Sequence, residues 1–194
     1  MTTFPVLAES LELLRHVGAA VPTDRLDDST PCSDWTVTQV LLHAAGDQHG
    51  WASVVGSSPQ PAYDPFAPPT QLIGTVDELI EPAIAAASAA WARVDAKAES
   101  VPTPLPPVPR LPAELAAAAA CALDAAVHAW DVAVATGQGS PLHAELAAQL
   151  MQAAQAVAEP LRGFAYAPAL PQQQRDDAAA ALLRYVGRHP DWTA

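Results

Sequence analysis

The chain has 194 residues, of which 51% are hydrophobic and 15% charged, and its net charge is −12 at neutral pH. This length suits one domain with a substantial core, and this composition excludes an intrinsically disordered chain. The negative charge disfavours nucleic acid and anionic membrane surfaces as partners, because their phosphates would be repelled.

Other classes are also disfavoured. No apolar run reaches the roughly 20 residues that a membrane-spanning helix needs. The first residues show no basic stretch before an apolar one, so we expect no signal peptide and a cytoplasmic protein. Two cysteines, Cys32 and Cys121, are too few for a disulfide framework.

Apolar residues recur at a spacing of three to four through most of the chain, which predicts an all-α fold. The first helix is expected from Phe4 to Ala20. Its buried face would carry four apolar side chains: Leu7, Leu11, Leu14 and Val17. Core packing is the expected role of this stripe.

The second and third helices have clear start signals. Residues 36–39 (Thr-Val-Thr-Gln) and residues 75–78 (Thr-Val-Asp-Glu) both fit a capping box, in which the two polar side chains satisfy free backbone N–H groups. The second helix should end near Gly56, and the Pro-rich residues 57–74 should form a loop across the bundle. Pro82 should kink the third helix or mark its true start.

Residues 101–109 contain five prolines and predict a stiff, extended connection. The fourth helix should run from Ala113 to Thr136, with Pro112 in its first turn and Gly137 after its end. Two further helices are expected at about 141–161 and 174–186. The sequence thus predicts a single all-α domain over residues 1–194, a four-helix bundle with extra C-terminal helices.

The strongest chemical signal lies in the fourth helix. Asp124 and His128 are four positions apart and therefore project from one helical face, in surroundings that are almost entirely apolar. A hydrogen bond between the two side chains in the core is one reading. His43, in an apolar stretch of the second helix, supports another, because two histidines and a carboxylate form a typical catalytic zinc site. The same ligands also suit non-haem iron.

Several neighbours could assist such a site. Asp47 lies one turn after His43 and could be a fourth ligand or orient one, although a solvated or capping role is favoured. His49 is expected at the surface or on the pocket rim. Cys121 shares a predicted face with Asp124 and His128 and could reach the ion.

Aromatic residues and the other cysteine are also candidates. Trp35 and Trp51 bracket His43 in the sequence, so we predict that both line a pocket. Cys32 precedes the second helix, and a packing role is favoured over an activated thiol.

Three segments resemble motifs of one family. Residues 30–37 (Thr-Pro-Cys-Ser-Asp-Trp-Thr-Val), followed by His43, resemble the opening motif of the mycothiol-dependent maleylpyruvate isomerase branch of the DinB-like superfamily. Residues 128–138, with His-Ala-Trp-Asp and Ala-Thr-Gly, are similar to a second motif of that branch. Residues 187–192 (Gly-Arg-His-Pro-Asp-Trp) resemble its C-terminal motif.

The resemblance implies a four-helix core with one metal ion, usually zinc, held by His43, Asp124 and His128. The family's acidic ligand is usually Glu, so the shorter Asp124 would bring the ion closer to the fourth helix or weaken its binding. The Pro-rich connection lacks the family's Pro-Phe-Gly. The isomerase itself has an additional C-terminal domain and acts on a dicarboxylate, whereas neither metal motif here contains Arg or Lys. We therefore do not expect maleylpyruvate isomerisation.

The function predicted from this resemblance is zinc-dependent transfer of a thiol, mycothiol, to a small electrophile. One alternative is a metal-dependent hydrolase in which Asp47 or His49 is the base. Another is a non-catalytic bundle that binds a metal or a hydrophobic small molecule. A small-molecule substrate is the expected partner, and a homodimer remains open.

Overall fold

The computed structural model describes residues 4–32, 35–56 and 58–193, with the side chains of 118–120 left out. Within these ranges the chain forms seven α-helices and one two-stranded sheet. The prediction of an all-α fold is confirmed. No helix in this described part of the chain is long and apolar enough to cross a membrane.

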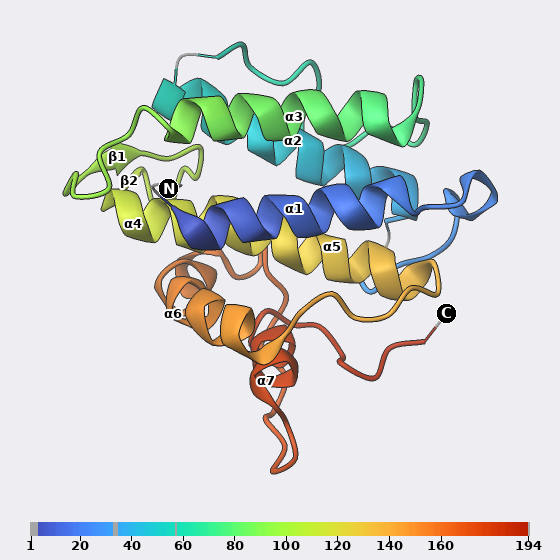
Figure 1. Cartoon of the computed structure of the whole chain (residues 1–194). Coiled ribbons are helices and arrows are strands. Elements are labelled where there is room, and N and C mark those ends of the chain that lie inside the picture. Colours follow the sequence, from blue (N-terminus) through green and yellow to red (C-terminus); the bar gives the residue numbers. More distant parts are fainter. Residues whose placement is uncertain (1–3, 33–34, 57, 194) are drawn as a thin grey trace.

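Four long helices lie side by side and form a bundle (Figure 1). They are α1 (Pro5–Ala19), α2 (Val37–Gly56), α3 (Val76–Trp91) and a composite helix. The composite helix consists of α4 (Ala113–Ala116), a π-helical turn (Ala117–Ala122) and α5 (Leu123–Ala135). Both α1 and α2 pack against α3 on one side and α5 on the other, so α2 and α5 are direct neighbours.

The bundle core is made of the faces that the helical spacing predicted. Leu7, Leu11, Leu14 and Val17 of α1 are all buried. The indole rings of Trp51 and Trp91 lie 5.9 Å apart and join α2 to α3. Burying side chains of this kind stabilises the fold by about 1.5–3 kcal/mol each.

The helix starts follow the local signals. The Gln39 amide donates to the Thr36 hydroxyl at 3.4 Å, and the Thr36 amide donates to the Gln39 side chain at 3.2 Å. The capping box of Thr75 and Glu78 is complete. Pro82, which was expected to kink α3 or begin it, lies within the helix on its exposed face, where water can solvate the carbonyl that loses its partner.

Gly56 does not follow α2 but belongs to its last turn. A Cβ atom there would lie 2.4 Å from the Cβ of Ala90 on α3. Glycine is therefore needed at this position for close approach of the two helices. A glycine does end α5. Gly137 follows this helix with φ +77°, and the backbone amides of Gly137 and Gln138 donate to the carbonyls of Val134 and Ala133.

The Pro-rich connection between α3 and α4 differs from the stiff, extended segment that the sequence predicted. It turns back on itself, because β1 (Val101–Pro102) pairs antiparallel with β2 (Arg110–Leu111). The Thr103 hydroxyl donates to the carbonyls of Leu105 and Val108 and holds the turn closed. Prolines fix the backbone angles of individual residues, but they do not prevent such a reversal.

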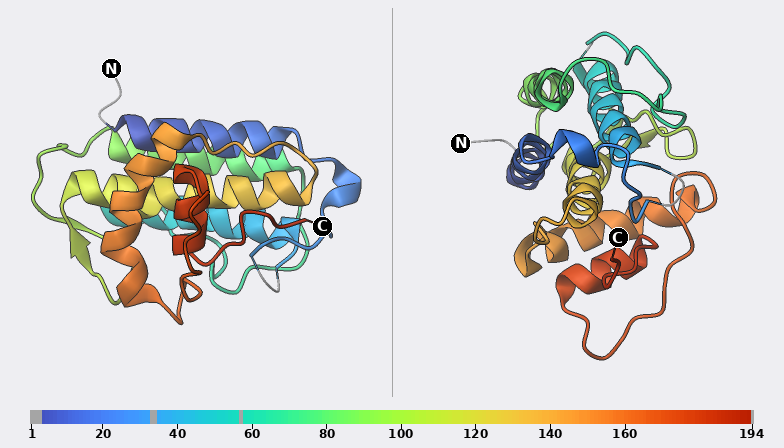
Figure 2. Two further views of the ribbon diagram at one scale, coloured as in Figure 1. Left: turned by 90° about the horizontal axis from the view of Figure 1, so that it is seen from below. Right: turned by 90° about the vertical axis from the view of Figure 1, so that its right-hand side faces the viewer.

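The C-terminal helices α6 (Ala144–Leu161) and α7 (Ala178–Tyr185) pack against each other, and α6 also contacts the π-helical turn. Figure 2 shows both helices on one side of the bundle, running across its axis. They cover the side of α5 that faces away from α3 (Figure 1). The segment between them lines a cavity together with residues of α2.

Candidate metal centre

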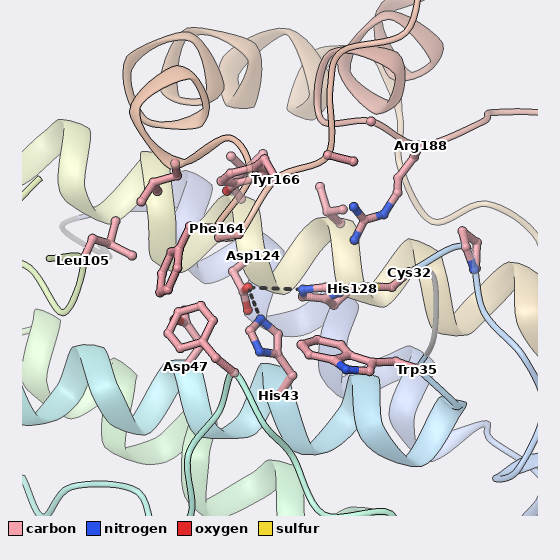
Figure 3. A pocket seen from close by; sticks show the side chains of 18 of the residues that line it. Cys32, Trp35, His43, Asp47, Leu105, Asp124, His128, Phe164, Tyr166 and Arg188 are labelled. Carbon is pink, nitrogen blue, oxygen red and sulfur yellow. Dashed lines mark hydrogen bonds and ion pairs between the residues drawn. The ribbon is translucent and has the colours of Figure 1, made fainter. Parts of the chain in front are cut away.

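The three predicted ligands meet between α2 and α5 (Figure 3). Asp124 Oδ1 lies 3.2 Å from His43 Nε2 and 3.3 Å from His128 Nε2. These three donor atoms all lie within 4.8 Å of one another, and both histidines are buried. The sequence spacing thus brought Asp124 and His128 to one face, and the packing of α2 on α5 added His43.

A carbonyl and a carboxylate fix the tautomers of the two histidines. His43 Nδ1 lies 2.7 Å from the carbonyl oxygen of Pro65, and His128 Nδ1 lies 2.9 Å from Asp131 Oδ2. Both partners are acceptors, so each Nδ1 carries a hydrogen and donates it. Each Nε2 of a neutral imidazole then presents its lone pair to the shared space, as metal-ligating histidines do.

This arrangement fits a cation. Two imidazole lone pairs and a carboxylate oxygen point at one another, and they repel unless a proton or a metal ion lies between them. Asp124 Oδ2 is buried and has no hydrogen-bond partner among the described residues, so the carboxylate has an unused metal-donor atom as well. Two neutral histidines and one carboxylate are a ligand set for zinc that leaves a coordination position open.

Without an ion, protons must take its place. Burial alone would lower the pKa of His128, but Asp124 and Asp131 raise it well above its usual value. Burial would raise the pKa of Asp124, yet the two histidines hold it below its ordinary range. A divalent ion would supply the same positive charge at a fixed point.

An ion pair from the C-terminus supports His128. Asp131 is fully buried, and Arg188 Nε and Nη2 donate to its two oxygens at 3.1 and 3.0 Å. The charge of Arg188 outweighs burial and lowers the pKa of Asp131. Asp131 therefore stays ionised and can hold the imidazole of His128 in place. Arg188 lies in residues 187–192, which resemble the family's C-terminal motif, but the sequence alone did not predict that its side chain would contact Asp131.

The π-helical turn directly precedes Asp124. Such turns add a residue to the helical repeat and recur at functional sites. Cys121 falls at the end of this turn, and its thiol donates to the Gln48 side chain at 2.8 Å rather than pointing to the three ligands. The prediction that Cys121 shares their face assumed regular α-helical geometry, which this turn interrupts.

A cavity of about 590 Å³ opens above the three ligands. Its walls come from α2 and the segment before it, from α5, from the loop before α3, from the turn between β1 and β2, and from the segments on both sides of α7. The rings of Phe66 and Phe164 lie 4.9 Å apart at its edge and are both partly exposed. Tyr166 lines the wall opposite α2 (Figure 3). No sequence signal marked these three aromatic residues.

Asp47 lines this cavity and is neither solvated nor a helix cap. The residue is 8% exposed, and Oδ2 has no hydrogen-bond partner in the described part of the chain. Burial, with the nearby Asp124 charge, raises the pKa of Asp47 well above its usual value. Its oxygens are not among the donor atoms that cluster with His43, so it is not placed as a fourth ligand.

The remaining candidates divide between the cavity and the core. Trp35 lines the cavity, with its ring centroid 4.8 Å from that of His43. Trp51 is fully buried against Trp91, so its predicted pocket role is wrong. His49 is half-buried and is not among the residues that line the cavity.

Cys32 lies at the cavity wall next to His128 and Asp131. These three residues could in principle hold an ion. However, His128 Nδ1 and both oxygens of Asp131 already have hydrogen-bond partners. Burial raises the pKa of Cys32, which favours an unreactive thiol.

A family model matches most of this chain. The sequence model described as the mycothiol maleylpyruvate isomerase N-terminal domain matches residues 7–133, which is more than half of the protein. The chain belongs to this family. The matched range contains all three candidate ligands and the supporting Asp131, whereas α6, α7 and Arg188 lie beyond it.

Two relatives of this family member come from Mycobacterium tuberculosis. They are the uncharacterized proteins Rv0738 of strain H37Rv and MT0763 of strain CDC 1551. Each is 31% identical over 176 residues, which covers 88% of this chain and 88% of the relative. No solved structure gives a significant match.

Proposed function

We propose that this protein is a zinc-dependent thiol transferase that joins mycothiol to a small electrophile in the cytoplasm. The observation that carries the proposal is the convergence of His43 Nε2, His128 Nε2 and Asp124 Oδ1 at the base of a cavity. The family description supplies the thiol, since it names mycothiol.

The residues of the chain would divide the work as follows. His43, Asp124 and His128 would hold the ion, and the Pro65 carbonyl and Asp131 would keep the two imidazoles oriented. A bound zinc ion lowers the pKa of a coordinated ligand and so supplies a nucleophile at neutral pH. The three ligands would thus serve as ligands and not as acid–base groups.

The cavity would position the second substrate. Trp35, Phe66 and Phe164 give it aromatic walls, and the rings of Trp35 and Phe66 lie beside His43. In a substitution, a bond forms between the thiol sulfur and an electrophilic carbon while the bond from that carbon to a leaving group such as chloride breaks, and the leaving group and the thiol proton go to solvent. In an addition to a double bond no group leaves, and the proton ends on the product. The volume of about 590 Å³ suits small molecules.

One feature favours metal-dependent hydrolysis as a second candidate. Asp47 is a buried carboxyl on the cavity wall whose Oδ2 has no hydrogen-bond partner within the described ranges, as a base acting on a water molecule would be before substrate binds. His49 has no such position. A third possibility, a bundle that binds metal or ligand without turnover, shares the same three ligands.

A rate measurement with matched reactions separates these candidates. Zinc-loaded protein would be mixed with a chloronitrobenzene electrophile in the presence and absence of mycothiol, and with an aryl ester. Thiol-dependent loss of the chloronitrobenzene, abolished in His128→Ala and retained in His16→Ala, is the expected result. Ester cleavage without thiol would instead favour the hydrolase, and no turnover of either probe would favour the binding protein.

A further inference from the structure

Two exposed phenylalanines meet at the edge of the cavity. Three large apolar side chains in the described part of the chain are exposed, Phe66, Ile73 and Phe164, and two of them, Phe66 and Phe164, line the cavity. These two come from loops that are far apart in the sequence, yet their ring centroids lie 4.9 Å from each other. Leaving such rings in water costs free energy. An apolar patch at the edge of a cavity is typical of a ligand-binding surface.

The loop that carries Phe66 is fixed to α2. The carbonyl of the preceding residue, Pro65, accepts the hydrogen of His43 Nδ1 at 2.7 Å. A Cβ atom on Gly46 of α2 would lie 2.9 Å from Pro65 Cγ, so the loop packs closely against the helix. The backbone at Phe66 is therefore held in position before any ligand binds.

Phe66 also contacts the candidate metal centre. Its ring centroid lies 5.7 Å from that of His43, in an edge-to-face arrangement, and the Trp35 ring lies 4.8 Å from the same histidine. Aromatic rings thus follow one another from the histidine ligand to Phe164 at the edge of the cavity. Aromatic faces favour another planar ring over a saturated one, because offset and edge-to-face contacts add to the burial of apolar area.

We propose that Phe66 and Phe164 form the binding surface for a planar aromatic ring of the electrophile, next to the candidate metal centre. The substrate class is then an aromatic electrophile. As a statement about substrates, this inference rests on the proposed function, but binding of an aromatic ring can be measured without any turnover.

Benzamide and cyclohexanecarboxamide test the proposal, because both are neutral and carry the same amide on a six-membered carbon ring. The zinc ion meets the same amide in both, and the saturated ring is the more hydrophobic. A cavity that selects by apolar area alone would therefore prefer cyclohexanecarboxamide. In an NMR titration of zinc-loaded protein, we expect benzamide to bind about twofold to tenfold more tightly. Equal affinities, a preference for the saturated probe, or binding of neither would overturn the proposal.

Variants compared at full zinc loading locate the effect. Phe164→Leu keeps an apolar side chain at the edge of the cavity but removes the aromatic face, so it should abolish the preference for benzamide. Ile73→Leu alters an exposed side chain that is not among the lining residues, and it should preserve the preference. A full preference in both Phe164→Leu and Phe66→Leu would refute the assignment.

The same measurements separate this inference from the proposed function. If thiol transfer to the chloronitrobenzene fails while the preference for benzamide holds, the proposed function falls and the aromatic surface stands. If the transfer proceeds but the preference is absent, the proposed function stands and the aromatic surface falls.

Discussion

The bundle and the C-terminal segment contribute to the same cavity in different ways. The bundle, from α1 to α5, provides all three candidate ligands from two helices that pack directly on each other. The segment from Leu161 to Arg188 provides the opposite wall, including Phe164 and Tyr166, and the guanidinium behind His128. The family match covers the first region up to residue 133 and stops before the second.

This difference separates two requirements of a metal site. Ligand atoms must be held within a fraction of an ångström, and backbone embedded in a packed helical core does this well. A wall that sets which molecules enter can vary more freely when it consists of loops. We therefore expect substitutions in the bundle to change metal binding most strongly and those in the C-terminal segment to change it less.

Removing a histidine ligand should have the largest effect. His128→Ala and His43→Ala should each lose zinc that wild-type protein retains through purification, with metal affinity falling by more than a hundredfold. Both variants should stay folded, because the apolar core lies elsewhere in the bundle. Metal analysis with circular dichroism measures this, and His16→Ala, at an exposed position, is the control. Full retention of zinc in both variants would refute the site.

Neutralising the carboxylate should come next. Asp124→Asn keeps the shape of the side chain but removes its charge, and an amide is a poor zinc ligand. We expect metal affinity to fall by about 10–100-fold or more, as measured by competition with a chelator. An unchanged affinity would make Asp124 merely a hydrogen-bond partner of the two histidines, which lie 3.2 and 3.3 Å away.

The contribution of the C-terminal segment can be tested at Arg188. Arg188→Met leaves Asp131 charged, fully buried and without its guanidinium partner, which should destabilise the fold by about 3–5 kcal/mol in urea unfolding. Metal affinity should fall by about tenfold, less than for a ligand, because His128 loses only indirect support. Combining the change with Asp131→Asn should restore part of the stability. A loss of zinc as complete as in His128→Ala would contradict the division between the two regions.

The cysteines should have the smallest effect on the metal. Cys32→Ser and Cys121→Ser should both keep zinc, because the Cys121 thiol bonds to Gln48 and the Cys32 sulfur does not belong to the cluster of His43, Asp124 and His128. In cobalt-substituted protein, a thiolate charge-transfer band should be absent until mycothiol is added. A band without added thiol that disappears in Cys121→Ser would mean that the Cys121 thiolate occupies the open coordination position. A non-catalytic metal-binding function would then be favoured.

The helices and part of the candidate metal site could be predicted from local sequence patterns. The helices followed from apolar spacing and from start signals such as the Thr75 and Glu78 pair. The pairing of Asp124 with His128 followed from a four-residue spacing, which a helix turns into neighbours. Errors arose where the geometry was not regular: at the π-helical turn that directs Cys121 towards Gln48, and in the Pro-rich segment that forms a hairpin.

What the sequence by itself determined is therefore the set of helices, their buried faces and the residue types able to bind a metal. Only the tertiary structure decided which groups stand behind and around them. Pro65 is 22 residues from His43 in the chain, and Arg188 is 57 from Asp131. Short-range spacing is fixed by the helix itself, whereas contacts over such separations depend on how loops and helices pack in space. The packing around α2 likewise decides that Asp47 lines the cavity, whereas Trp51, one turn later, is fully buried against Trp91.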